Sequence, residues 1–502
     1  MAAPAPTMNA PDSGVTVRMY RQGLGDCFLL AFPPSRGSRP RFMLIDCGVL
    51  LGTPEGEGKV RKVVEHILES TGGRIDVLVA THEHWDHLSG FEQARDLFEK
   101  LKIGEVWVAW TEDPEDGVSR SLRRERAAAL RALTATVAHL RASGGEESIR
   151  KAGSIEPVLG FFGDLSSLAV DGKPSGIEGA MDYVVGRGKP PRYRTPGEGP
   201  FPVPGAAGVR VYVLGPPKDL DFLKRSDPHK GEAYEARLAL DENTAFVSAV
   251  LHAQDKAGER PMSPEEKEVA RLAFPFDKTF RVDPEDAKQD PFFQELYYGA
   301  PGQPSQQDLE WRRIETDWMG SAGSLALKLD SDTNNTSLAL AIELVPSGKV
   351  LLFPGDAQAG NWNSWHKLEW PRKDDPDHPV TVADLMRRTV LYKVGHHASH
   401  NATLREKGLE LMADPDLVAM IPVDEKMAHK PKGSSPKGWD MPFPPLLKRL
   451  KEKTNGRVLR VDQGLPKRPT KVPAGEWKRF TDCCDEKELY IDFTVEGKPR
   501  PE

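Results

Sequence analysis

Residues 81–90 of the chain, THEHWDHLSG, place three histidines and one aspartate within six positions, directly after an apolar run. His82 and His84 are two positions apart, so in an extended segment both side chains point to the same side. Asp86 and His87 follow where the chain turns. Neutral imidazole and carboxylate oxygen are usual ligands of a divalent cation such as zinc. The spacing predicts one wall of a site for two adjacent metal ions, and the alternative is a solvated histidine-rich loop.

Two later segments have related chemistry. FPGDAQ places Asp356, a carboxylate able to bridge two cations, directly after an apolar run. VGHHASH ends another such run with His396, His397 and His400. Each segment alone is weak, because GD is also typical of a turn with a helix-capping aspartate. In this order, after the first motif, we interpret both as ligand-bearing strand ends.

Short apolar runs and helix-spaced apolar residues surround these motifs. We expect strands at the runs VTVRMY, CFLLAF, RFMLIDCG, IDVLVAT and EVWVAW, and helices at GKVRKVVEHILES and SGFEQARDLFEKL. Strand character returns with SLALKLD, TSLALAIEL and KVLLFPGDA, followed by a helix-like NWNSWHKLEW and the strand TVLYKVGHHASH. The pattern predicts an α/β protein built from two strand-rich blocks.

The expected organisation has five parts. They are a disordered lead-in (1–14), the first half of the main domain (15–110), an insertion or cap outside the continuous sheet (111–322), the second half of the main domain (323–435) and a basic C-terminal extension (436–502). The extension ends in ELYIDFTV, which has strand character.

The amino-acid composition restricts the class of protein and its cellular location. Of 502 residues, 38% are hydrophobic and 28% charged, which is ordinary for a globular protein. The net charge of −7 argues against a general polyanion-coating protein but leaves a local basic groove open. We expect no membrane span, no secretory signal and no disulfide scaffold from four cysteines, and therefore a reducing, cytoplasmic location.

The motifs together resemble a known superfamily. GLGDCFLL, LIDCG, THEHWDHLSGF, NNTSLALAI, LLFPGDA and YKVGHHASH, in this order, are similar to the metallo-β-lactamase fold superfamily. They are most similar to its ComEC/Rec2-like hydrolases and the related phosphorylcholine esterases of teichoic acid. The resemblance covers about residues 15–110 and 320–405. It implies a four-layer αββα sandwich with a two-metal site at the sandwich edge, here with a large insertion and a C-terminal extension.

The resemblance also implies roles for individual residues. The metal ligands would be His82 and His84 for the first ion, Asp86, His87 and His397 for the second, and Asp356 as the bridge. His396 would lie beside the reacting group as a ligand or proton donor, and Asp46 would orient ligands. Many members have a further histidine ligand between these motifs, for which the chain offers His139, His229 or His252.

Other polar residues have two interpretations. Lys393 lies just before GHH and would stabilise a phosphate or leaving group, or is simply solvated. Asp26 contacts the site or, the interpretation we favour, caps a turn. Asn334 and Asn335 approach a substrate or form a polar turn. The tryptophans of NWNSWHKLEW are predicted to pack in the core rather than line a cleft.

These features predict a metal-dependent hydrolase holding two Zn or Mn ions. Two cations lower the pKa of a water to about 7 and stabilise negative charge as a nucleophile adds. Asp86 would also orient the nucleophile, with His396 or Lys393 assisting the leaving group. We expect a phosphodiesterase, first a nuclease, because the basic stretches SRSLRRER and LLKRLKEKTNGRVLR could meet a phosphate backbone. The alternatives are a hydrolase of small lactones, lactams or phosphocholine-type esters, and a non-catalytic, metal-stabilised component that binds a partner protein through the insertion.

Overall fold

The structure is a computed structural model of the 502-residue chain. It describes residues 7–143, 146–163, 176–225, 246–247, 250, 262, 264, 267, 282, 284–298, 320–372, 375–430 and 438–498. Two compact units are present. The first comprises Met1–Arg124, Pro157–Arg237 and Lys328–Glu502, and the second comprises Glu125–Glu156 and Leu238–Leu327. All strands described below belong to the first unit.

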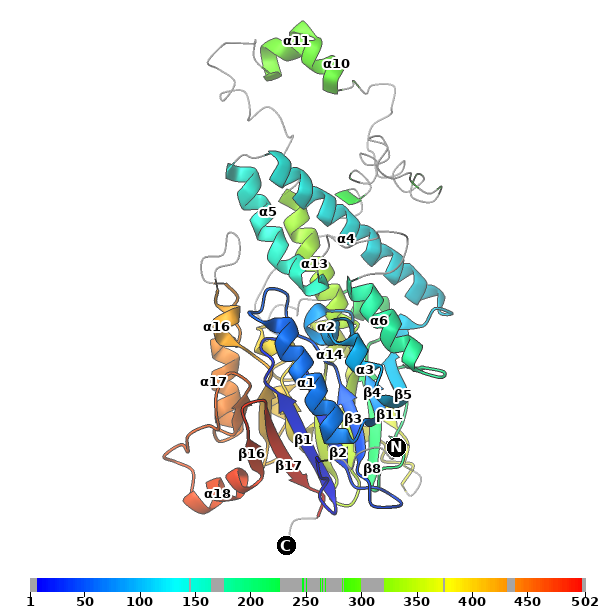
Figure 1. The fold of residues 1–502 in the computed structure, drawn as a ribbon, viewed down its shortest axis with the longest axis vertical. Coiled ribbons are helices and arrows are strands. Elements are labelled where there is room, and N and C mark those ends of the chain that lie inside the picture. The colour runs from blue at the N-terminus through cyan, green and yellow to red at the C-terminus, as the bar shows by residue number, and fades with distance from the viewer. Residues whose placement is uncertain are drawn as a thin grey trace. The chain divides into compact units, whose positions relative to one another are not determined.

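The first sheet is mixed and has eight strands among the described residues (Figure 1). In spatial order they are β16 (Cys484–Glu486), β17 (Tyr490–Glu496), β1 (Gly14–Tyr20), β2 (Phe28–Phe32), β3 (Arg41–Ile45), β4 (Arg74–Val79), β5 (Lys102–Ala109) and β6 (Arg192–Arg194). Strands β1, β2 and β3 are successively antiparallel, and β3 to β6 are parallel. The expected strand ELYIDFTV is confirmed as β17, which pairs with β1 along its full length.

The second sheet is also mixed and has seven strands in the described part of the chain. In spatial order they are β15 (Val458–Arg460), β14 (Val418–Ile421), β13 (Thr389–Lys393), β10 (Lys349–Phe353), β9 (Ala339–Leu344), β8 (Val209–Gly215) and β7 (Phe201–Pro202). Strands β10, β13, β14 and β15 run parallel, whereas β9 is antiparallel to both of its neighbours. A separate two-stranded pair consists of β11 (Glu369–Trp370) and β12 (Val380–Thr381).

One hydrophobic core joins the two sheets. It contains Val17, Phe28 and Val79 from the first sheet together with Ile342 and Phe353 from the second, all buried. The rings of Phe28 and Phe353 meet edge to face with centroids 5.6 Å apart. The two sheets therefore pack face to face across this core, which fits the alternation of apolar residues along their strands.

Helices pack against the sheets through apolar faces. Each face forms because apolar residues recur at helix spacing in the sequence. Helix α1 (Gly56–Thr71) buries Val60, Val63, Val64 and Ile67 and packs against β4, as its sequence predicts. Helix α2 (Trp85–Gln93) follows β4 and contacts α1 and α6 (Gly176–Arg187). Helices α14 (Ala359–Trp365) and α15 (Val382–Arg387) contact β8 and β10 of the second sheet.

One predicted strand is wrong. SLALKLD lies in helix α13 (Gly320–Asn335), not in a sheet. The alternating leucines mimic a strand, but the buried positions are Ala322, Leu325, Ala326 and Leu329, while Leu327 is exposed. This spacing of three and four residues is helical, and it was obscured by an apolar residue on the exposed face.

The insertion predicted for residues 111–322 does not lie entirely outside the sheets. Strand β6 belongs to the first sheet, and β7 and β8 belong to the second. In VRVYVLG the side chains of Val211 and Val213 enter the core between the sheets, as the alternation of that run would have indicated. The remainder includes α4 (Gly117–Ser143) and α5 (Glu146–Leu159).

The composition led us to expect neither a membrane-spanning helix nor a disulfide scaffold. No described helix is long and apolar enough to cross a membrane. The four cysteines, Cys27, Cys47, Cys483 and Cys484, are all free thiols.

Candidate metal centre

The residues of the candidate centre come from strand ends that meet at one edge of the two sheets. Asp46 follows β3 and the motif containing His82 follows β4, and these two strands are parallel. Asp356 follows β10 and His397 follows β13, which are also parallel. Since the carboxyl ends of parallel strands share an edge, side chains far apart in the sequence converge there.

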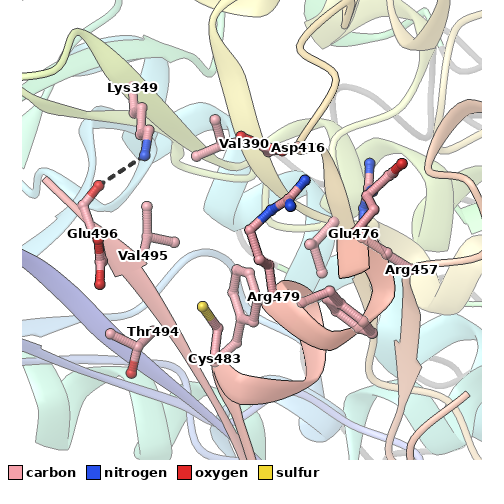
Figure 2. A pocket seen from close by; sticks show the side chains of 13 residues that line it. Lys349, Val390, Asp416, Arg457, Glu476, Arg479, Cys483, Thr494, Val495 and Glu496 are labelled. Atoms are coloured by element: carbon pink, nitrogen blue, oxygen red, sulfur yellow. Dashed lines mark hydrogen bonds and ion pairs between the residues drawn. The ribbon is translucent and has the colours of Figure 1, made fainter. Parts of the chain in front are cut away.

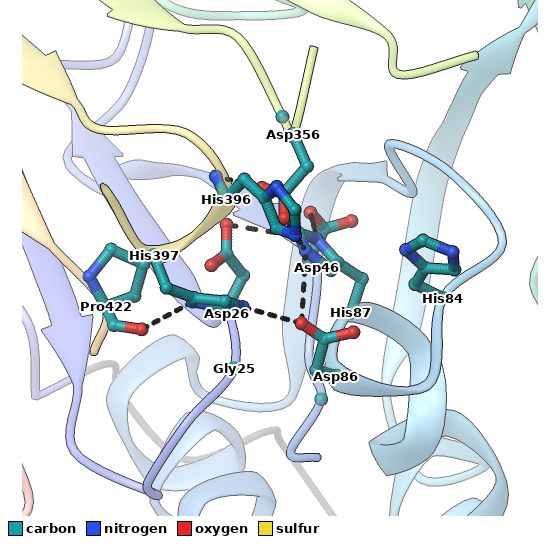
Figure 3. Close-up of polar contacts among 12 residues, drawn as sticks. Gly25, Asp26, Asp46, His84, Asp86, His87, Asp356, His396, His397 and Pro422 are labelled. Carbon is teal, nitrogen blue, oxygen red and sulfur yellow. Dashed lines mark hydrogen bonds and ion pairs between the residues drawn. The ribbon is translucent and has the colours of Figure 1, made fainter. Parts of the chain in front are cut away.

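Four of the predicted ligands form one buried group. Asp86, His87, Asp356 and His397 each offer a ligand atom within 4.8 Å of the others, and together they could hold a metal ion. The Nε2 atom of His87 lies 3.2 Å from Asp356 Oδ2 and 3.7 Å from Asp86 Oδ2. The Nε2 atom of His397 lies 2.7 Å from Asp86 Oδ2. Figure 3 shows these side chains turned toward a common point.

The polar atoms that face this point are not satisfied by the protein. Asp86 Oδ1, Asp356 Oδ2 and His87 Nε2 are buried and take part in no hydrogen bond with the described residues. A buried polar atom without a hydrogen bond normally costs about 1–3 kcal/mol. Three such atoms from two segments of the chain, on residues whose ligand atoms lie within 4.8 Å of one another, fit a bound divalent cation.

Each histidine of this group is oriented through the ring nitrogen that faces away from the centre. Asp46 Oδ2 lies 2.8 Å from Nδ1 of His87, and the carbonyl oxygen of Pro422 lies 2.8 Å from Nδ1 of His397. A proton on each Nδ1 leaves the Nε2 lone pair for a cation, the usual arrangement behind histidine ligands. Asp46 thus lies where the family resemblance suggested.

His82 and His84 lie beside the group of four. Nε2 of His82 is 3.1 Å from Nδ1 of His84, so two ring nitrogens face each other at a separation suited to a shared cation. The rings of His82 and His87 are 4.2 Å apart at their centroids. All three histidines are buried. The extended backbone expected for His84 is present (φ −117°, ψ 148°), and this residue is the N-cap of α2.

Thr81 is a site residue that the motif did not predict. Its hydroxyl donates to Asp46 Oδ2 at 2.7 Å and therefore accepts from Nδ1 of His82 at 3.0 Å. Asp46 consequently orients His87 directly and His82 through Thr81. Thr81 directly precedes the first histidine of the motif, but a hydroxyl at that position has no distinctive sequence signal.

Lys393 does not occupy the position predicted for a leaving-group contact. Its ammonium is buried and lies 2.5 Å from Asp26, 2.9 Å from Asp356 Oδ1 and 2.9 Å from the carbonyl oxygen of Gly355. Three acceptors use all three of its protons. Lys393 therefore fixes Asp356, and Asp26 is part of the centre rather than only a turn cap.

The centre has a strongly negative field. Burial lowers the pKa of His87, but Asp356, Asp26, Asp86 and Asp46 outweigh burial and raise it well above the usual value. Burial likewise opposes a charge on His397, whereas its hydrogen bond to Asp86 raises its pKa. Without a cation, protons on these imidazoles supply the positive charge that the carboxylates require. A divalent cation would supply the same charge at the same atoms.

The pKa values of four further buried groups near the centre are shifted as well. Burial lowers the pKa of His84 to about 3 and that of His396 to about 4, so both are neutral imidazoles at neutral pH. Burial, and then the charges of Asp86 and Asp356, raise the pKa of Asp330 well above its usual value. Burial also opposes the charge on Lys393, but Asp26 and Asp356 outweigh it and raise the pKa of the ammonium.

The neutral state of His396 changes its predicted role. Its Nδ1 is 2.9 Å from the hydroxyl of Ser399, which donates to Asn401 Oδ1 and so accepts a proton from the ring. Nε2 of His396 then carries the lone pair. In this state His396 is suited to accept a hydrogen bond or bind a cation, and not to protonate a leaving group.

The backbone around the centre is closely packed and strained. A Cβ atom at Gly25 would lie 2.6 Å from the carbonyl oxygen of Asp86, and one at Gly48 would lie 2.4 Å from the carbonyl carbon of Asp86. Only glycine permits this approach. Three consecutive non-glycine residues, His396 to Ala398, have positive φ angles of 45°, 52° and 64°, as does Asp46 at 55°. Such residues cost of order 1–3 kcal/mol each and are typical of functional sites.

Further predicted residues have structural roles. Asn335 Oδ1 accepts from the backbone N–H groups of Gln358 and Asn361, which braces the segment after Asp356. The tryptophans at 362, 365 and 370 are buried, which confirms the prediction that they pack in the core. Of the candidates for a further histidine ligand, His139 is exposed on α4, and residues 229 and 252 lie outside the described residues.

A cavity of about 220 Å³ lies at the amino end of β10, opposite the end that carries Asp356 (Figure 2). Lys349, Arg457, Arg479 and Cys483 are among the residues that line it. Lys349 already donates to the carbonyl oxygen of Glu496. Arg457 is ion-paired with Glu476 at 2.9 Å. Lys349 and Arg457 therefore already have partners within the protein.

In comparisons with known proteins, no family model matches the chain and no curated protein matches its sequence. The interpretation of the centre therefore depends on its donor set, burial and charge. These support a buried Asp/His site that could hold a metal ion.

Proposed function

We propose that the chain is a metal-dependent hydrolase with the four-layer αββα sandwich of the metallo-β-lactamase superfamily. Two facing mixed sheets with helices against them, and the order of ligand motifs along the chain, support this assignment. The observation that carries the proposal is the buried group of Asp86, His87, Asp356 and His397, whose ligand atoms lie within 4.8 Å of one another and in which three polar atoms have no hydrogen bond to the described residues.

The proposed centre holds two divalent ions, Zn or Mn. His82 and His84 would bind the first, Asp86, His87 and His397 the second, and Asp356 would bridge them. The chemistry that such ions supply is activation of water near neutral pH and stabilisation of negative charge on a phosphoryl or carbonyl oxygen. Asp86 Oδ2 lies 2.7 Å from Nε2 of His397, the atom that would bind the second ion, and Asp86 Oδ1, which has no hydrogen bond to the described residues, would be available to orient a water. The neutral His396 would accept a hydrogen bond from that water.

The proposed reaction is hydrolysis of a phosphodiester. The order of the motifs and their similarity to the ComEC/Rec2-like branch support it. The basic stretches support a nucleic-acid substrate only weakly. In the C-terminal stretch, Arg457 and Arg460 are buried in ion pairs with carboxylates, and Arg449 is paired with Glu410. Arginine side chains held in these ion pairs are not available to bind a phosphate backbone.

A second candidate is a hydrolase of small esters, and the aromatic residues beside the centre favour it. Phe161 stacks on Trp439 with centroids 4.9 Å apart, and its ring also lies 5.6 Å from that of His84 and 6.4 Å from that of His396. An aromatic pair next to the predicted ligands would suit a compact substrate with an apolar or cationic group.

The test uses full-length protein loaded with Mn²⁺ or Zn²⁺. Labelled single- and double-stranded DNA and RNA, and bis-p-nitrophenyl phosphate as a small diester, would be incubated with it in parallel. We expect metal-dependent cleavage of at least one diester. The double variant D86A/H87A should be inactive, because it removes two ligands.

The control variant is E410Q, which changes a surface ion pair with Arg449 and should cleave at the wild-type rate. Cleavage of the small diester alone would assign a small-molecule phosphodiesterase. Cleavage of lactones or carboxylic esters but of no phosphodiester would favour the second candidate. Metal-loaded protein that hydrolyses none of these substrates would contradict the proposed function.

A further inference from the structure

The histidines of the centre differ in which ring nitrogen faces inward. His82, His87 and His397 present Nε2, and an oxygen lies near each of their Nδ1 atoms at 2.8–3.0 Å. His84 is reversed, because its Nδ1 is the atom that lies 3.1 Å from Nε2 of His82. The outer nitrogen of His84 is therefore Nε2, and it needs an acceptor if Nδ1 is to bind a cation.

The outer nitrogen of His84 faces a carboxylate from another element. His84 Nε2 is buried and makes no hydrogen bond to any described residue. Oδ1 of Asp330 lies 3.7 Å away and is equally unsatisfied. The pair therefore consists of one donor position and one acceptor, both removed from solvent, at a distance slightly too long for a hydrogen bond.

Asp330 is held in this place by its own helix. It lies on α13 with 9% of its surface exposed, and Nδ2 of Asn334, one turn later, donates to its Oδ2 at 3.3 Å. The other oxygen, Oδ1, remains for His84. A buried carboxylate with one oxygen anchored and one unsatisfied beside a predicted ligand differs from the half-buried Asp332 of the same helix, which pairs with Lys328.

We propose that Asp330 is the positioning residue of His84. In this arrangement Asp330 accepts the Nε2 proton of His84, which keeps the Nδ1 lone pair beside His82 for the first metal ion. A cation on Nδ1 would make the imidazole a stronger donor and would strengthen this contact. The inference depends on the proposed two-metal centre and adds a residue that the motifs do not contain.

The test measures how many Zn²⁺ ions each full-length variant binds, and how tightly, by isothermal titration of chelator-treated protein. We expect two ions in the wild type. D330A should bind one ion about 10–100-fold more weakly and the other with unchanged affinity. D330E, which restores the carboxylate, should recover most of the affinity, and D330N should be intermediate. D332N, on the same helix, is the matched control and should bind as the wild type does.

Unfolding curves of the metal-free variants separate positioning from folding, because a positioning role predicts similar curves for D330A and D332N. Wild-type affinity for both ions in D330A would overturn the inference while leaving the proposed function intact. Equal weakening of both ions with a lower unfolding midpoint would also overturn it and indicate a structural role. Absence of bound metal in the wild type would remove the proposed centre together with this inference.

Discussion

Two of the buried charge clusters in the first unit differ in how completely their polar atoms are hydrogen-bonded. In the second sheet, Glu343 receives hydrogen bonds on both carboxylate oxygens. Arg210 Nε and the Tyr212 hydroxyl donate to Oε2 at 2.5 and 2.8 Å, and Arg388 donates to Oε1 at 2.7 Å. Every acceptor of this cluster has a donor, as expected for a cluster that only stabilises the fold.

The candidate centre contains similar groups, yet Asp86, Asp356 and His87 each keep one buried atom without a hydrogen bond in the described structure. Both clusters are strongly charged, so charge and burial alone do not identify a site. The informative difference is that the unsatisfied atoms of the centre belong to residues whose ligand atoms lie within 4.8 Å of one another. If that difference reflects function, variants of the centre should change metal affinity, whereas variants of the Glu343 cluster should change only stability.

The largest effect on metal affinity is expected for D86N. In the metal-free protein the asparagine oxygen still accepts from protonated His397, but the charge and the second ligand oxygen are lost. We expect zinc affinity to fall by more than about 100-fold. The free energy of unfolding of the metal-free protein should change by less than about 1 kcal/mol. Titration calorimetry measures the zinc affinity and denaturant unfolding measures the stability. A large loss of stability in the metal-free protein with unchanged zinc affinity would contradict this prediction, because Asp86 would then stabilise the fold as Glu343 does.

A smaller effect is expected for T81V, which removes the hydroxyl between Asp46 and His82 at constant size. The ring of His82 then loses the acceptor on Nδ1, and we expect about a tenfold weaker binding of one ion. T81S retains the hydroxyl and should bind normally. If T81V and T81S bind zinc equally, the proposed relay from Asp46 through Thr81 is wrong.

His396 should affect reaction more than binding. Because its Nε2 carries the lone pair, H396Q removes a hydrogen-bond acceptor beside the reacting group. We expect kcat to fall by about 100-fold with unchanged zinc affinity. Steady-state kinetics with the small diester, together with zinc titration, test this. A parallel loss of one bound ion would instead identify His396 as a ligand.

The Glu343 cluster should leave metal binding unaffected. E343Q should lower the free energy of unfolding by about 2 kcal/mol, with and without zinc, because two arginines lose their carboxylate. Burial raises the pKa of Glu343, but Arg210 and Arg388 outweigh it and hold the pKa below the usual value.

The pH dependence of this contribution follows from the lowered pKa. The stabilisation is present above the unfolded-state pKa of about 4.3 and is lost as the pH falls through the lower folded-state value. Urea unfolding of wild type and E343Q should therefore differ at pH 7 and converge in strong acid. A difference that persists in acid, or a change in zinc affinity, would contradict the assignment.

Much of the fold followed from apolar periodicity. The strands before each motif and helix α1 lie where the sequence predicts them. Each of these elements buries apolar residues, and the spacing of those residues in the sequence indicates the type of element. The prediction failed for SLALKLD, where exposed Leu327 completes a false alternation. It also failed for β8, whose short apolar run lies within a region rich in glycine, proline and charge.

The candidate site was predictable where its residues are neighbours in sequence. Asp86, His87, Asp356 and His397 belong to recognisable strand-end motifs, and the structure brings them together. The residues that hold them were not predictable. Thr81 and Asp330 act through single contacts to a histidine, and the ion pair of Lys393 with Asp26 joins segments more than 350 positions apart. Such contacts depend on tertiary structure and leave no local pattern.

The most direct test of the central claim is the metal content and affinity of the wild-type protein. Chelator-treated protein would be titrated with Zn²⁺, and the bound ions counted by elemental analysis after dialysis. We expect two ions per chain, with unfolding stabilised by at least about 2.7 kcal/mol when free zinc is 100-fold above its Kd. Protein that retains no zinc and unfolds at the same midpoint with and without it would contradict the account.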